Sequence, residues 1–164
     1  MSDDSHDEGD EYDDYGLFES KLSFDAIQET IEIYKDLLDL DMDVYIDITT
    51  QFQDGTLAHT KYKKGDDHGT IVFGRREIEF LGDKYGSEDA SEYLKGVIAH
   101  EVWHLRQYEE YSPRKIKRMR KEGSIEMNAH MFELKQSKLS DDKWDEMTKS
   151  LLSFKEKETS YTSQ

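Results

Sequence analysis

The sequence predicts a single α+β domain in which a small, mostly antiparallel sheet packs against several helices. Apolar residues recur at helical spacing near both ends of the chain, whereas short runs between about residues 44 and 80 alternate apolar and polar residues as strands do. A length of 164 residues and a hydrophobic content of 35% suffice for one buried core. We expect the folded domain at residues 17–157, between a disordered acidic tail at 1–16 and a disordered end at 158–164.

Residues 24–40 form the first expected helix, because their apolar positions repeat at i, i+3, i+4 and i+7. Those positions are Phe24, Ile27, Ile31, Tyr34, Leu37 and Leu38, and Ser23 precedes them as a candidate cap. Alternating residues predict a strand at 44–48 and two more on either side of Gly74, at 71–73 and 78–80. Between them, residues 54–69 combine a short candidate strand with turn residues.

The second half of the chain is expected to be helical. Ser87 is a candidate N-cap followed by acids in the first turn, and the helix that it begins carries one apolar stripe. The stripe consists of Leu94, Val97, Ile98, Val102 and Leu105. Ser112-Pro113 predicts a helix start, Gly123 an interruption, and Ser124 the cap of another helix. Ser140 is expected to cap a last helix, whose apolar residues are Trp144, Met147, Leu151, Leu152 and Phe154.

The segment 100–104, His-Glu-Val-Trp-His, has the pattern H-E-x-x-H inside the expected helix that starts at Ser87. Two His four residues apart lie on one face of a helix, one turn from each other, so that both imidazoles can reach one ion. The pattern predicts a Zn²⁺ site with His100 and His104 as ligands. Glu101 lies beside the ion rather than on it, where it can take a proton from a metal-bound water.

A catalytic zinc ion usually has three protein ligands and keeps one position for water, so one ligand is still missing. The chain contains no Cys, which leaves His59, His68, His130 and the acidic residues as candidates. Glu126 falls in the first turn of the helix expected to start at Ser124. We expect Glu126 to be the third ligand.

The sequence HEVWHLRQ, followed about two dozen residues later by ExxA on the next expected helix, resembles the gluzincin side of the zincin metallopeptidases. It is most similar in plan to minimal bacterial and phage zincins of the SprT and ImmA/IrrE kind. The resemblance covers roughly residues 68–135. It implies a zincin-like fold with an active-site helix carrying His100, Glu101 and His104 and a second helix carrying Glu126. It also implies hydrolysis of peptide bonds, with Glu101 as general base.

Zincins of this pattern often have an Asp four residues after the ligand Glu, and that Asp hydrogen-bonds a ligand His. Here the position holds His130. Because His130 shares a helix face with Glu126, we expect it to orient a ligand or to stabilise charge in the transition state, in preference to binding the metal. Arg106, Tyr108 and Tyr111 are further candidates for stabilising an oxyanion, and the sequence leaves the choice open.

Three other residues or segments have expected roles near the site. The strand near Thr70–Gly74 is the expected edge on which a peptide substrate lies extended. Trp103 should face away from the metal, as part of the core or of a cleft wall. Gln107 is expected either to contact backbone or substrate or to lie on the plain helix surface.

The net charge of −16 is concentrated at the start of the chain, where residues 1–16 contain eight acidic residues and no Lys or Arg. Such a block repels itself and lacks apolar surface, so we expect a disordered tail. It either acts as a solvating segment or binds a basic partner. A basic cluster within the chain offers one such surface and consists of Arg114, Lys115, Lys117, Arg118, Arg120 and Lys121. Direct nucleic-acid binding is not expected, because phosphates repel an acidic body.

The sequence contains no secretory signal and no apolar run of membrane-spanning length, so a cytoplasmic protein is expected, and a phage or plasmid product would look the same. The function expected from the motif is a zinc peptidase acting on a protein or peptide. One alternative is a zincin-fold binding or regulatory protein without catalysis, whose acidic tail engages a partner. Another is an acidic DNA mimic without a metal.

Overall fold

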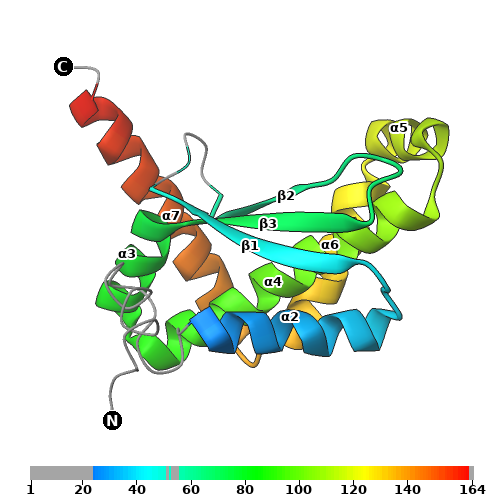
Figure 1. Ribbon diagram of the computed structural model, residues 1–164. Coiled ribbons are helices and arrows are strands. Elements are labelled where there is room, and N and C mark those ends of the chain that lie inside the picture. Colours follow the sequence, from blue (N-terminus) through cyan, green and yellow to red (C-terminus); the bar gives the residue numbers. More distant parts are fainter. Residues whose placement is uncertain (1–23, 51, 53–55, 163–164) are drawn as a thin grey trace, which may run out of the picture.

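The computed structural model describes residues 24–50, 52 and 56–162, with side chains only as far as Lys155 in the last helix. The α+β class is confirmed (Figure 1). The described elements are α2 (Phe24–Leu38), β1 (Asp43–Thr49), β2 (Ala58–Lys61), β3 (His68–Gly74), α3 (Arg75–Tyr85), α4 (Ser87–Glu110), α5 (Pro113–Glu122), α6 (Ser124–Gln136) and α7 (Asp141–Thr162). The expected acidic tail and the candidate cap Ser23 lie outside the described residues.

The three described strands form a mixed sheet in the order β1-β3-β2. β1 pairs parallel with β3 over seven residues, and β2 pairs antiparallel with β3 over four. The expectation of a mostly antiparallel sheet is therefore wrong for β1. β1 and β2 lie on opposite sides of β3. The alternation of apolar and polar residues in a strand does not indicate whether the neighbouring strand runs parallel or antiparallel to it.

Strand β3 lies in the centre of the sheet, so the expectation that residues 70–74 form a peptide-binding edge is wrong. Its backbone is paired on both sides, by β1 and by β2. The consecutive buried residues Ile71, Val72 and Phe73 are typical of a strand covered on both faces. The exposed edge of the described sheet that adjoins α4 belongs to β2.

Residues 75–85 are helical, which corrects the expectation of a strand at 78–80. Ile78 and Leu81 are buried three residues apart, as one face of a helix requires, and Phe80 stacks on Phe154 with ring centroids 4.5 Å apart. A three-residue alternation is too short to distinguish the two structures. At the other end, the backbone of α7 is helical to Thr162, so the expected disordered end does not begin at 158. No Gly or Pro occurs between 141 and 162 to end the helix.

Two of the four expected helix caps among the described residues are confirmed, Ser112 and Ser140. The expected cap Ser87 is instead the first residue of α4, because Gly86 occupies the cap position. The hydroxyl of Ser112 accepts a hydrogen bond from the Lys115 amide at 3.2 Å, and Ser140 caps α7 in the same way. Gly123 ends α5 with a φ of 79°, a left-handed conformation that favours glycine. Ser124 is the first residue of α6 and not its cap, because Gly123 occupies that position and the Ser124 hydroxyl donates to the Met119 carbonyl.

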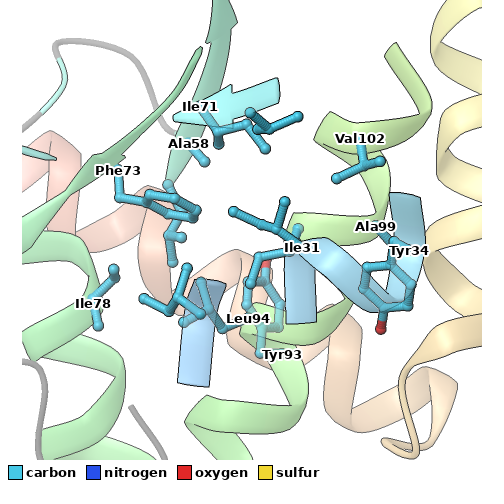
Figure 2. Close-up of a cluster of buried hydrophobic side chains, with 14 of the residues drawn as sticks. Ile31, Tyr34, Ala58, Ile71, Phe73, Ile78, Tyr93, Leu94, Ala99 and Val102 are labelled. Atoms are coloured by element: carbon cyan, nitrogen blue, oxygen red, sulfur yellow. The ribbon is translucent and has the colours of Figure 1, made fainter. Parts of the chain in front are cut away.

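The hydrophobic core lies between the sheet and helices α2 and α4 (Figure 2). Phe73 and Ile71 of β3, Ile31 of α2 and Val102 of α4 are fully buried there. Helix α4 is thus held by the core along one side and packs against α6 along another (Figure 1). No helix of the described chain combines the length and apolarity that crossing a bilayer requires.

A buried ion pair joins α3 to α7. Glu77 is fully buried and its Oε2 lies 2.5 Å from the Nζ of Lys155, which is 5% exposed. The same Oε2 accepts a hydrogen bond from the backbone amide of Phe52 at 3.0 Å. Gly74 leaves the space that the carboxylate needs, because a Cβ at that position would lie 2.3 Å from Glu77 Oε1. The pair therefore ties the last helix to the end of the sheet.

Breaking this pair from one side should destabilise the protein strongly. Lys155→Met should lower the free energy of unfolding by about 3–5 kcal/mol, because a buried carboxylate then lacks its counter-charge. In the double variant Glu77→Gln/Lys155→Met, both charges are gone and an acceptor for Phe52 remains, so most of the loss should be recovered. The control is Lys149→Met at an exposed position of α7. Urea denaturation that gives Lys149→Met and Lys155→Met the same loss would contradict the structural role of the pair.

Candidate metal centre

Helices α4 and α6 bring three metal-binding side chains to one point. His100 and His104 lie one turn apart on α4, with their Nε2 atoms 3.1 Å from each other. Glu126, in the first turn of α6, places Oε1 3.1 Å from the Nε2 of His100 and Oε2 3.2 Å from the Nε2 of His104. The three ligand atoms lie within 4.8 Å of one another. The structure thus brings together the three residues expected as ligands.

Each imidazole forms a hydrogen bond through its Nδ1 atom. His100 Nδ1 lies 2.7 Å from Glu133 Oε1, and His104 Nδ1 lies 3.0 Å from Gln107 Oε1. The amide nitrogen of Gln107 donates to the Ile125 carbonyl at 3.3 Å, so its oxygen must face His104 and accept. Both rings therefore donate from Nδ1, and in the neutral form the Nε2 of each carries a lone pair.

The donor set at this point fits a divalent cation. Two Nε2 lone pairs and one carboxylate converge, and neutral imidazoles place no hydrogen between them. Ligand atoms at zinc-ligand distances of about 2.0–2.2 Å are separated by roughly 3.3 Å in a tetrahedron, close to the observed spacing. The His104 side chain is only 6% exposed, whereas that of Glu126 is 71% exposed. An ion here would be fixed on the α4 side and open to solvent beside Glu126.

The two histidines differ in their electrostatic surroundings. Burial disfavours the charged form of His100, but the hydrogen bond that His100 donates to Glu133 and the charge of Glu101 outweigh it and raise its pKa. Burial and the neighbouring charge of His100 lower the pKa of His104. One positive charge is therefore favoured at this point and a second is disfavoured.

The candidate base Glu101 is 8% exposed, and burial raises its pKa to about 7 in spite of a hydrogen bond from Thr60 that acts in the opposite direction. Thr60, on β2, places its hydroxyl 2.5 Å from Glu101 Oε1 and 3.2 Å from the Glu101 carbonyl. The edge strand thus orients this carboxylate. A carboxyl group with a pKa near neutrality is suited to both accept and release a proton.

Glu133 is the site residue that the sequence reasoning missed. It lies seven residues after Glu126, two helical turns along the same face of α6, and its side chain is 9% exposed. Its contact with His100 resembles the one that an Asp often makes in the zincin pattern, at the position that His130 holds here. His130 lies on its outer side, with Nδ1 3.1 Å from Glu133 Oε1, and reaches the ligands only through this carboxylate. The seven-residue spacing placed Glu133 on the helix face of Glu126, but nothing in the sequence paired it with His100.

The remaining expected residues are divided between the site and its surroundings. The ring of Tyr108 lies nearly parallel to that of His104, with centroids 5.8 Å apart and an angle of 9°. Arg106 lies on another side of α4, where it covers Trp103 and pairs with Glu110 at 3.8 Å. Trp103 packs against Phe132 and away from the ligands, as expected. Gln107 is 3% exposed and anchors His104, so a plain surface position is excluded.

Neither His59 nor His68, both considered as ligands and both found in strands, reaches the site. His59 packs its ring on Phe52, with centroids 4.5 Å apart. His68 pairs with Asp67 at 3.1 Å and contacts the ring of Tyr45. Among the described residues, the only metal-ligand cluster of this kind is the one formed by His100, His104 and Glu126.

Two cavities flank the centre. One, of about 250 Å³, has a mainly apolar lining that includes Val97, Trp144 and Leu151, and it reaches His100 and Glu101. The other, of about 290 Å³, lies beyond the far end of β2 and is lined by Thr60, Tyr108 and Arg120 among others. The two differ in chemistry, and both border the carboxylate of Glu101 or its partner Thr60.

No protein-family model, curated protein or solved structure matches this chain. The resemblance of the motif to the zincins therefore stays a prediction from the residues that carry it.

The hydrogen bonds behind the two imidazoles should control metal affinity. Glu133→Leu and Gln107→Leu keep bulk and remove the acceptor, so each should weaken Zn²⁺ binding about 10–100-fold with the fold intact. His130→Leu should have a much smaller effect, because His130 contacts Glu133 and not the ligand atoms. Competition titration against a chromophoric chelator measures the affinities. A larger loss in His130→Leu than in Glu133→Leu would show that the roles are reversed.

Proposed function

We propose that this protein is a zinc-dependent metallopeptidase that holds one Zn²⁺ through His100, His104 and Glu126. The observation that carries the proposal is the convergence of three ligand atoms beside a buried carboxylate, Glu101, that is not among them. A site that only stored a cation would have no use for a separately oriented acid beside its three ligands.

The donor set favours zinc over other common cations. Imidazole nitrogen suits Zn²⁺ better than Mg²⁺ or Ca²⁺, which prefer oxygen ligands throughout. Three protein ligands are the usual number at a catalytic zinc, where a fourth position stays open. When bound, zinc supplies Lewis acidity, which makes a water more acidic and polarises a substrate carbonyl.

Side chains of the protein carry out the remaining steps. Glu101 accepts the proton of the attacking water and passes it to the leaving amine. Thr60 holds one carboxylate oxygen by its hydrogen bond, so the other is directed to the proton. Glu133 and Gln107 keep the two imidazoles in the orientation that presents Nε2.

A peptide substrate is supported by the position of β2. Within the described sheet, β2 is an edge strand that pairs with β3. An extended peptide can add to such an edge through main-chain hydrogen bonds, largely independent of its side chains. Because Thr60 of this strand contacts Glu101, a peptide bound there passes the base.

The zinc content of ligand variants tests the metal site. Purified protein should contain one zinc per chain, and His104→Ala or Glu126→Gln should lower the occupancy and the melting temperature, since a ligand bound to the native state stabilises it by mass action. Glu122→Gln removes an exposed acid at the end of α5 and should change neither. Elemental analysis that finds full zinc in Glu126→Gln but loss in His130→Ala would make His130 the third ligand.

Glu101→Gln separates a peptidase from a binding protein. The substitution keeps the size of the side chain and removes the base, so zinc content and melting temperature should stay near those of the wild type. Peptide hydrolysis should fall by about a hundredfold or more, the scale of general-base loss. The measurement is a comparison of new peptide termini in cells that express either form at equal level.

Identical termini for wild type and Glu101→Gln, both fully loaded with zinc, would refute the peptidase function. Unchanged affinity for a captured partner in the same two forms would then favour the regulatory alternative.

A further inference from the structure

The cavity beyond the end of β2 has a composition unlike the rest of this acidic chain. Its volume is about 290 Å³, and tyrosines 62, 108 and 111 contribute to its walls. Lys64 and Arg120 also line it, whereas no carboxylate does among the described residues. In a chain with a net charge of −16, this is a local positive and aromatic site.

The ammonium group of Lys64 already has hydrogen-bond partners within the protein. It donates to the backbone carbonyls of Tyr108 at 3.3 Å, Glu109 at 2.9 Å and Tyr111 at 3.4 Å. These carbonyls belong to the last turn of α4 and the residue after it, where a positive charge is favoured. Lys64 therefore closes the cavity on the loop side and leaves Arg120 as the cation available to a ligand.

The guanidinium of Arg120 contacts Tyr108 but has no negatively charged partner among the described residues. Its Nη2 lies 3.4 Å from the Tyr108 hydroxyl, and its centre lies 5.8 Å from the Tyr108 ring. No carboxylate in the described part of the chain forms an ion pair with it. A guanidinium has five N–H donors, so several stay free. Because the Tyr108 hydroxyl accepts from Arg120, its own proton can be donated to a ligand.

The cavity adjoins the proposed peptidase site through two of its lining residues, Thr60 and Tyr108. Thr60 lines it and also donates to Glu101. Tyr108 lines it and also lies parallel to the ring of His104. A strand advances about 3.3 Å per residue, so a peptide on β2 that passes Glu101 places a neighbouring side chain at this cavity.

We propose that this cavity binds the carboxylate side chain of a Glu or Asp next to the cleaved bond, an assignment that rests on the proposed peptidase function. Arg120 and the Tyr108 hydroxyl donate to the carboxylate, and Ile116 and Pro113 contact the methylene groups. A planar guanidinium matches the two oxygens of a carboxylate better than an ammonium does. The substrate class is thus an acidic peptide.

Selection from a random heptapeptide library tests the cavity without requiring cleavage. The bait is full-length, zinc-loaded Glu101→Gln protein, and bound peptides are sequenced. Asp and Glu should be enriched about tenfold over Asn and Gln at one position, the scale of a charge-assisted hydrogen bond. Adding Arg120→Gln should abolish the enrichment, and Arg120→Glu should replace it by enrichment of Lys and Arg.

Arg118→Gln is the matched control, because it makes the same change two residues earlier, on the opposite side of α5. It should retain the acidic enrichment. A bait that selects no acidic position, or that loses the preference equally in Arg118→Gln and Arg120→Gln, would overturn the proposal.

A cleavage arm with the wild-type protein keeps the two proposals apart. Acidic selection by the bait without any cleavage by the wild type would refute the peptidase function and support an acidic-peptide binding site. Cleavage at sites without a neighbouring acid would refute the subsite and leave the peptidase function intact.

The acidic residues of 1–16 are a second source of carboxylate side chains, within the chain itself. A full-length bait in which the eight acids of this tail are changed to Asn and Gln separates the two sources. Stronger enrichment than with the native tail would show that the tail competes for the cavity, and equal enrichment would assign the cavity to peptides bound in trans. Either result supports carboxylate binding, whereas loss of the preference would contradict it.

Discussion

The close packing of α6 along α4 is the contact on which the whole site depends. Two of the carboxylates around the histidines, Glu126 and Glu133, come from α6, while both histidines come from α4. Gly96 permits the approach, since a Cβ there would lie 2.5 Å from Trp144 and 3.3 Å from the Glu133 carbonyl. With any larger residue at 96, the Trp144 ring of α7 has to shift, and the α6 backbone at Glu133 has to give by a few tenths of an ångström.

Electrostatics explain why this arrangement favours a cation. Glu101, Glu126 and Glu133 surround two imidazoles in a chain that is already strongly acidic. Burial holds a proton on Glu101 more tightly than in water, and the nearby carboxylates do the same for His100 against the opposing effect of burial. A divalent ion relieves the same repulsion at the point where the lone pairs converge. Metal affinity and the protonation of the base are therefore coupled through the same few charges.

The two cavities make the two ends of the candidate active site chemically different. The apolar one lies beside the start of β2 and the positive one beside its end, with the Thr60–Glu101 contact between them. Under the proposed peptidase function, a peptide paired with β2 would meet different chemistry on the two sides of Glu101. Main-chain pairing would supply general affinity, and the unlike cavities would supply side-chain selection.

The sequence by itself determined the features that depend on near neighbours in the chain. The helical face shared by His100 and His104, the caps at Ser112 and Ser140 and the break at Gly123 follow from local geometry, and all were predictable. Glu126 was predictable as a partner because two consecutive helices have to pack. Only the tertiary structure decided the direction of β1, the edge position of β2 and the binding of His100 by Glu133. These features depend on contacts between residues distant in sequence, and such contacts produce no periodic pattern in the sequence.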